Sequence, residues 1–135
     1  MDDTDRLIVE ELSMNSRITM KELGKKVHMT GQAASDRIAR LEDRGVIEGY
    51  TIRVNHEKLG YPVHALLTIQ MTGGDHRSYL SYLDRHKEYV LRNYKVSGNG
   101  CYQLECRFPS NDELDAFLTG LGRSANYSLS IVIKK

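Results

Sequence analysis

The segment from Ile18 to Gly45 constrains the fold of this chain more than any other part of it. Two short helical patterns, each with its own start signal, are separated there by a turn of about three residues. The second pattern places small polar residues on its first turns and basic residues further on. Such a pair is typical of a helix-turn-helix, whose second helix enters the major groove of duplex DNA.

Start and stop residues define these two helices. Thr19 precedes Glu22 by three residues, which predicts a capping box, and Thr30 is the expected N-cap of the second helix. Gly24 lies inside the first helix, where glycine costs about 1 kcal/mol relative to alanine. We attribute this glycine to the close approach of a crossing helix. Gly45 stands where a left-handed C-cap is expected.

The outward face of the second helix carries the side chains that we expect to meet DNA. Ala34, Ile38 and Leu41 recur at helical spacing and should face inward. Asp36 is expected to pair with Arg40, which would offset its repulsion from phosphate. The predicted base-side residues are Gln32, Ala33, Ser35 and Asp36, and those that hold phosphates or position the helix are Lys21, Thr30, Arg37 and Arg40.

The charge pattern fits a local DNA contact, although the whole chain is nearly neutral. Its 135 residues include 19 Lys and Arg against 18 Asp and Glu, a net charge of +1. Between Met20 and Leu41, however, five basic residues stand against two acidic ones, and phosphate contact needs only such local charge. A solvated helix surface, or an ordinary three-helix bundle without a DNA role, would show the same features. Both alternatives stay open on these grounds.

The rest of the chain predicts a second domain in which strands and helices alternate. Four strand patterns and two helical patterns follow one another between Val63 and Ile133, in the order β-α-β-β-α-β. This order is that of the split βαβ plan, a four-stranded antiparallel sheet with both helices on one face. The first helix is expected to bury Tyr79, Leu80, Tyr82 and Leu83. The open sheet face, expected to carry Leu66, Leu91 and Val132, is a natural dimerisation surface.

We therefore predict an α+β protein. Residues 1–54 form a helix-turn-helix (winged-helix-like) domain, residues 55–62 a hinge, and residues 63–135 a β-α-β-β-α-β (ferredoxin-like) domain. Asn55, Gly60 and Pro62 mark the hinge. A strand is predicted from Tyr50 to Val54, where β-branched and aromatic residues are frequent.

No pattern in the chain indicates an enzyme, a metal site, a cofactor or a membrane segment. The five histidines lack metal-ligand spacing, and no nucleophile stands beside a plausible base. Two cysteines are too few for a disulfide framework, which predicts free thiols. The N-terminal residues lack a secretory signal, and no apolar run approaches the roughly 20 residues of a membrane helix. We expect a cytoplasmic protein.

Taken together, these patterns resemble the Lrp/AsnC (feast/famine) family of transcriptional regulators, and within it the bacillus LrpC group, over nearly the whole chain. The resemblance rests on Asp5 with Ile8 and Leu12, Arg17-Ile18, Glu22-Leu23-Gly24, Arg37-Ile38 with Arg40-Leu41-Glu42, and Gly45-Val46-Ile47-x-Gly49-Tyr50. It implies a sequence-specific regulator of transcription with a RAM/ACT-like C-terminal domain. It also implies a homodimer, in many members part of an octamer, whose DNA-binding heads span successive major grooves about 34 Å apart.

The resemblance further implies an amino-acid effector site at the hairpin turn. Many members carry Gly-x-x-Asp there, and the aspartate helps to hold the amino group of the effector. This chain has Gly98, Asn99, Gly100 and Cys101 instead. A neutral thiol removes a counter-charge for an ammonium group, so we expect a weakened or absent effector response, with DNA bending or wrapping. The alternative function is a small-molecule sensing module whose helical head binds a protein partner.

Overall fold

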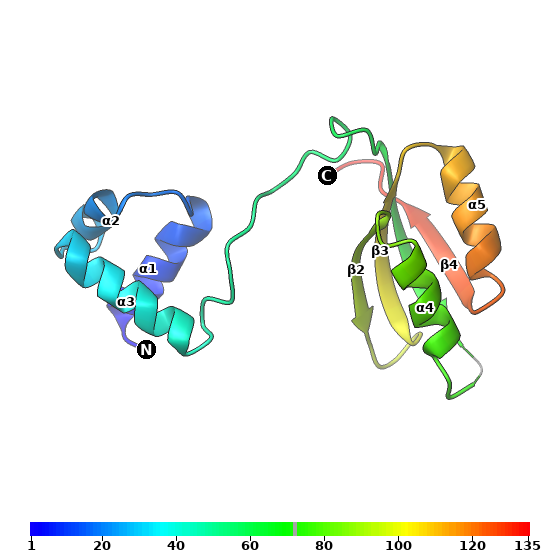
Figure 1. Ribbon diagram of the computed structural model, residues 1–135, viewed down its shortest axis with the longest axis horizontal. Helices are drawn as coiled ribbons and strands as arrows, with labels where there is room; N and C mark the ends of the chain where they lie inside the picture. Colours follow the sequence, from blue (N-terminus) through cyan, green and yellow to red (C-terminus); the bar gives the residue numbers. More distant parts are fainter. Residues whose placement is uncertain (72) are drawn as a thin grey trace. The chain divides into compact units, whose positions relative to one another are not determined.

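The chain folds as two compact units, each with its own hydrophobic core. The computed structural model describes residues 1–71 and 73–135, and the two units run from Met1 to Arg53 and from Val54 to Lys135. Figure 1 shows helices alone in the first unit and a sheet with two helices in the second. The residues of the predicted hinge, 55–62, belong to the second unit. No helix in the described part of the chain is long and apolar enough to cross a membrane.

The first unit consists of α1 (Asp3–Met14), α2 (Met20–Lys26) and α3 (Gly31–Asp43). Apolar residues spaced three or four apart bring one face of each helix into a shared core. Ile8 of α1, Leu23 of α2 and Ala34 of α3 are fully buried at its centre. Ile38 and Leu41 are buried with Ala34, which confirms the predicted inward face of α3.

Each helix of this unit begins directly after a residue whose side chain caps it. Asp2 accepts a hydrogen bond from the amide of Asp5 at 2.8 Å, and the Asp5 carboxylate accepts one from the amide of Asp2 in return. Thr19 caps α2 by accepting from the amide of Glu22 at 3.1 Å, and Thr30 caps α3 in the same way. The starts predicted at Thr19 and Thr30 are confirmed. Each such cap contributes about 1 kcal/mol.

Helix α3 ends in a Schellman motif around Gly45. The φ angle of Gly45 is 74°, a left-handed conformation that glycine adopts without steric cost. Its amide donates to the carbonyl of Glu42 at 3.0 Å, and the amide of Val46 donates to the carbonyl of Leu41 at 2.9 Å. The predicted C-cap is confirmed, and the chain leaves α3 at a defined residue.

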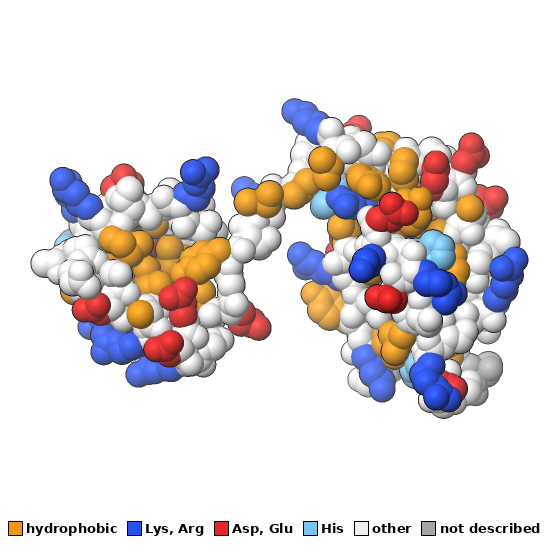
Figure 2. Space-filling model, viewed as in Figure 1, with side chains coloured by type: hydrophobic (Ala, Val, Ile, Leu, Met, Phe, Trp, Pro, Cys, Tyr) orange, Lys and Arg blue, Asp and Glu red, His pale blue; other side chains and the backbone are white. Residues whose placement is uncertain are grey.

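The prediction of a strand from Tyr50 to Val54 is wrong. Residues 48–55 form neither helix nor strand, and the exposed fractions of Tyr50 and Ile52 are 52% and 78%. Residues of this type favour a strand only where a neighbouring strand completes the hydrogen-bond ladder. The first unit contains no strand among its described residues, so this segment has no partner there. Figure 2 shows hydrophobic side chains exposed along it.

The second unit contains β1 (Val63–Gln70), α4 (Arg77–Arg85), β2 (Val90–Lys95), β3 (Tyr102–Phe108), α5 (Asn111–Leu121) and β4 (Asn126–Ile131). Its strands are antiparallel in the order β2-β3-β1-β4. This arrangement confirms the predicted β-α-β-β-α-β fold. Leu67 of β1 lies between Leu104 of β3 and Leu129 of β4, which fixes the register of the three strands.

Helices α4 and α5 cover one face of this sheet, and the core lies between them and the strands (Figure 1). Tyr79 of α4 and Phe117 of α5 are almost fully buried against alternate residues of β1 and β3. The Tyr82 hydroxyl donates to the carbonyl of Phe117 at 2.7 Å and ties the two helices together. The prediction that Leu80 is buried is wrong. Its side chain is 44% exposed.

Strand β4 is an exposed edge of the sheet. All six of its residues are exposed, including Leu129 and Ile131 on the same side of the sheet as the core residues of β1. The strand predicted to continue to Ile133 ends earlier. The amide of Val132 donates to the carbonyl of His64, next to the first residue of β1, so Ile133 has no neighbour and is 96% exposed.

The sheet face away from the helices is mostly polar. Leu66 is 43% exposed there, as expected, whereas Leu91 and Val132 are half-buried. Near its centre, Nε2 of His64 and a carboxylate oxygen of Glu105 lie 2.6 Å apart. A second copy of this face would therefore meet both apolar and charged groups.

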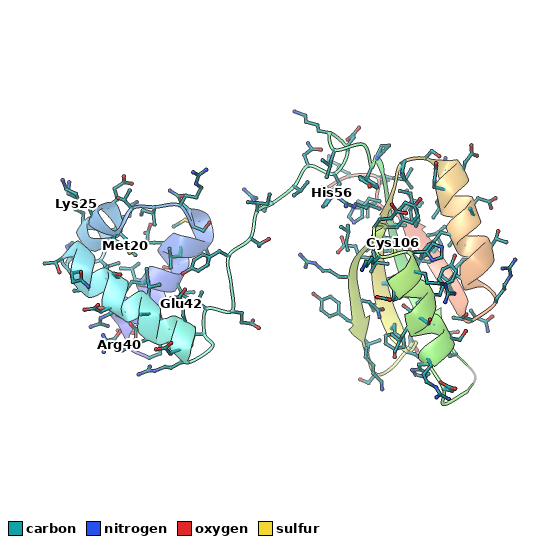
Figure 3. The ribbon with its side chains drawn as sticks, viewed as in Figure 1. Met20, Lys25, Arg40, Glu42, His56 and Cys106 are labelled. Carbon is teal, nitrogen blue, oxygen red and sulfur yellow. The ribbon has the colours of Figure 1, made fainter. Side chains whose placement is uncertain are left out.

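Arg107 fixes the segment that precedes β1. It donates to Nδ1 of His56 at 2.7 Å, and its guanidinium lies 4.1 Å above the centre of the Tyr61 ring. Burial and the nearby positive charge of Arg107 lower the pKa of His56, in keeping with a neutral ring that accepts this hydrogen bond. Part of the predicted hinge is thus anchored to the second unit (Figure 3 labels His56).

Candidate nucleic-acid interface

Two glycines let α2 and α3 cross in close contact. A Cβ on Gly24 would lie 2.5 Å from the carbonyl oxygen of Met29, and a Cβ on Gly31 would lie 3.3 Å from the amide nitrogen of Lys21. Only glycine at position 24 leaves room for the turn that leads into α3. Because Gly31 packs against the first turn of α2, the N-terminal ends of α2 and α3 lie together. Lys21 and Thr30 are therefore neighbours at one end of the pair.

His28 closes the turn between these helices in a left-handed conformation. Its φ angle is 59°, which is rare for a residue with a side chain. The amide of Met29 then donates to the carbonyl of Gly24 at 2.8 Å, and the chain turns directly into the Thr30 cap. This role of His28 was not predicted from the sequence, although histidine is among the non-glycine residues enriched in the left-handed conformation.

The outermost residues of α3 form a hydrogen-bonded pair on its exposed face. Nε2 of Gln32 donates to a carboxylate oxygen of Asp36 at 3.0 Å, one turn further along the helix. The pair predicted between Asp36 and Arg40 is not formed among the described residues. Asp36 instead holds the amide of Gln32.

Arg37 points toward α1 and is engaged by two carboxylates. Its Nη1 donates to Asp2 at 2.6 Å and to Asp5 at 3.2 Å. The amide of Asp5 and the Arg37 guanidinium together lower the pKa of the Asp2 carboxyl, and the two carboxylates raise the pKa of Arg37. The same aspartates cap α1, so one network joins the start of α1 to the middle of α3. Arg37, which was predicted to hold a phosphate or to position the helix, thus has two carboxylate partners within the protein.

The eight residues predicted to contact DNA differ in the exposure of their side chains. Lys21, Thr30, Gln32, Asp36 and Arg40 are exposed, and Ala33, Ser35 and Arg37 are half-buried. Lys25, on α2, and Arg40, on α3, are labelled in Figure 3, where both side chains lie on the outside of the helical unit. Arg44, an exposed cation at the C-cap of α3 and one turn beyond Arg40, was not predicted from the sequence. The spacing of three basic residues at i, i+3 and i+7 would have indicated it.

The hairpin segment from Gly98 to Cys101 folds back onto the end of β1. Gly98 and Gly100 have φ angles of 94° and 118°. A Cβ on Gly100 would lie 2.8 Å from the Thr68 side chain, and the amide of Cys101 donates to the carbonyl of Ile69 at 2.6 Å. Backbone contacts thus fix the turn, and the half-buried Cys101 side chain lies near the carbonyl of Met71.

Over the described residues, no group of three or more His, Cys, Asp or Glu side chains could hold a metal ion. Cys106 is fully buried, and burial raises the pKa of its thiol to about 12. These features describe an unreactive core thiol.

Comparison with known proteins supports the interpretation of the helical unit as a DNA-binding domain. Residues 1–48 match the model of a family described as winged helix-turn-helix DNA-binding. The HTH-type transcriptional regulator LrpA of Bacillus subtilis (strain 168) is 51% identical over 135 residues, which cover 100% of this chain and 99% of that protein.

Two solved structures resemble the whole chain. The structure of B. subtilis LrpC has a TM-score of 0.92 at 27% identity, covering 100% of this chain and 96% of that one. The feast or famine regulatory protein from M. tuberculosis, solved in complex with L-methionine, has a TM-score of 0.89 at 30% identity, covering 99% and 92%. Of the two B. subtilis proteins, LrpA has the higher identity to this chain.

Proposed function

The chain belongs to the Lrp/AsnC family of HTH-type transcriptional regulators, and on that premise we propose that it binds duplex DNA by placing the first turns of α3 in the major groove. The observation that supports this placement is the α2–α3 crossing at Gly24, which leaves the Gln32–Asp36 pair exposed at the outer surface of α3. A DNA-binding regulator of transcription needs such an exposed helix N-terminus to reach base edges.

In this proposal the base-contacting and phosphate-contacting residues are different. Gln32, with its amide oriented by Asp36, contacts a base edge, and the half-buried Ala33 and Ser35 flank it. Lys21 and Thr30, at the adjoining helix ends, contact phosphates on one side of the groove.

A salt titration with two variants tests this division. Lys21→Ala should weaken binding to all duplexes and reduce the slope of log K against log salt by about 0.9. Gln32→Ala should leave that slope unchanged and relax preference at one base pair, at a cost of about 1–3 kcal/mol for the preferred sequence. Fluorescence anisotropy with random and selected duplexes between about 50 and 200 mM salt measures both effects. If neither variant changes binding, the placement of α3 is wrong.

We further propose that the protein acts as a homodimer built through the open faces of two sheets. The Leu66 side chain, which is 43% exposed on this mostly polar face, supports this assignment. A two-fold dimer would present two copies of α3 to successive major grooves about 34 Å apart. Leu66→Glu should shift the sedimentation of the protein to that of a monomer and weaken binding to a two-site duplex. A wild-type protein that sediments as a monomer would contradict the proposal; a larger species would favour assembly into octamers.

The hairpin from Gly98 to Cys101 is the proposed effector site, with a weakened response to amino acids. A solved relative carries L-methionine in its structure, but in this chain the turn offers a neutral thiol at Cys101. Calorimetric titration with each amino acid should give weak or absent binding to the wild type. Cys101→Asp should strengthen binding because it supplies a counter-charge for the ammonium group. Tight binding by the wild type would contradict this assignment.

A further inference from the structure

The helical unit has a pocket outside the face proposed to contact bases. It has a volume of about 250 Å³ and lies between the start of α1 and the second half of α3. Asp2 and Asp5 line it from α1, and three arginines line it from α3, namely Arg37, Arg40 and Arg44. The three arginines are spaced at i, i+3 and i+7, so they share one side of the helix.

Both acidic residues pair with the same one of these three cations, and the five side chains together carry a net charge of +1. Arg37 takes both aspartates, through contacts of 2.6 and 3.2 Å. Neither Arg40 nor Arg44 forms an ion pair with a described residue, and both are exposed. Two guanidinium groups one turn apart thus remain available at the rim of one pocket, a chemistry suited to an oxyanion such as phosphate.

The length of α3 places these groups beyond the base-contacting residues. At 1.5 Å per residue, Arg40 lies about 12 Å and Arg44 about 18 Å along the helix axis from Gln32. A recognition helix contacts base edges through its N-terminal residues, so the proposed placement of Gln32 leaves the C-terminal half of α3, with Arg40 and Arg44, for contact with the phosphate backbone.

We propose that Arg40 and Arg44 form a binding site for DNA backbone phosphate at the edge between α1 and α3, and that Arg37 is the positioning residue that holds this edge together. Asp2 and Asp5 bind Arg37 and at the same time cap α1, so the start of α1 and the arginine side of α3 form one rigid edge. This inference rests on the proposed insertion of α3 into the major groove.

Salt-dependent binding of the full-length protein to a random-sequence duplex tests the phosphate site. Arg44→Gln and Arg40→Gln should each weaken binding about tenfold and reduce the salt slope by about 0.9. Arg85→Gln is the matched control, because Arg85 is also an exposed arginine in the last turn of a helix, but in the second unit. Its slope should equal that of the wild type. If Arg44→Gln behaves like Arg85→Gln, the phosphate site is refuted.

A second comparison tests the role of Arg37. Arg37→Gln should weaken binding and lower the unfolding midpoint while leaving the salt slope unchanged, because its charge is already paired. Adding Asp5→Asn should restore part of the midpoint by removing an unpaired carboxylate. A slope reduced by about 0.9 in Arg37→Gln would instead make Arg37 a phosphate contact.

The outcomes separate this inference from the proposed function. If the wild-type protein does not bind any duplex, the placement of α3 on DNA fails and the phosphate site fails with it. If the wild type binds, Lys21→Ala weakens binding and Arg44→Gln does not, the placement stands and only the phosphate site is wrong.

Discussion

Replacing Gly24 with alanine tests the contact on which the DNA-binding face depends. The added methyl carbon would lie 2.5 Å from the carbonyl oxygen of Met29 and 3.0 Å from the carbonyl carbon of Thr30. Carbon and oxygen atoms normally approach no closer than about 3.3 Å. Both obstacles are backbone atoms, which cannot rotate out of the way as a side chain can. The start of α3 must therefore move away from α2 by most of an ångström.

Two opposing effects decide the stability of Gly24→Ala. Alanine in place of glycine within a helix is worth about 1 kcal/mol in favour of folding. Forcing a methyl group into a filled site costs about 1–3 kcal/mol, and the fixed backbone places this site at the upper end. We expect a net destabilisation of about 1–2 kcal/mol, which lowers the Tm of so small a unit by roughly 4–15 °C. Duplex binding should weaken as well, because the Gln32 end of α3 is displaced.

Circular dichroism melting and duplex titration of the full-length variant measure these effects. Gly49→Ala is the control, because nothing lies within 4 Å of the position that its Cβ would occupy. The control should match the wild type to within about 0.5 kcal/mol. A Gly24→Ala protein that melts at or above the wild-type temperature would show that helix propensity dominates, and the argument from close approach would be refuted.

The other predictions concern the turn, the charge network, the thiols and the anchored segment. His28→Gly should raise the free energy of unfolding by about 1 kcal/mol, and with it the urea midpoint, because it relieves the strain of the left-handed backbone; a lower midpoint would contradict this. The pKa of Asp2 is lowered in the folded state, so the unfolded chain takes up the proton first as the pH falls. The stability that Asp2 contributes should be complete above about pH 4 and lost at lower pH, and Asp2→Asn should abolish this loss; identical pH profiles of midpoint for the two proteins would exclude it. Ellman's reagent should modify Cys101 well before the buried Cys106, and equal rates under native conditions would contradict the burial. Arg107→Ala should speed hydrogen exchange at residues 55–61, and unchanged protection would rule out the anchoring contact.

Local signals in the sequence were sufficient for the starts of α2 and α3, the order of strands and helices along the chain, and most core residues. A cap such as Thr30 depends only on atoms within one helical turn, and alternation within β1 or β3 depends only on which face is covered. For the same reason the inward face of α3 and the left-handed Gly45 could be predicted. Each of these features follows from residues that are close together in the sequence.

Contacts between distant segments could not be predicted in this way. The Asp2–Arg37 pair joins residues 35 positions apart, and nothing within either helix indicates the partner. Asp36 had two candidate partners, at i−4 and i+4, and in the structure it pairs with Gln32 at i−4. The residues from Tyr50 to Val54 have strand propensity, but propensity alone does not supply the second strand that a ladder requires.

The separation of the two cores has an evolutionary consequence. Among the described residues, the apolar cluster of the helices and that of the sheet share no member. Substitutions in one cluster therefore leave the packing of the other unchanged. A recombination breakpoint in the segment 48–54 would interrupt neither cluster. Descendants of such a gene could therefore exchange the helical DNA-binding unit alone while inheriting the core of the second unit intact.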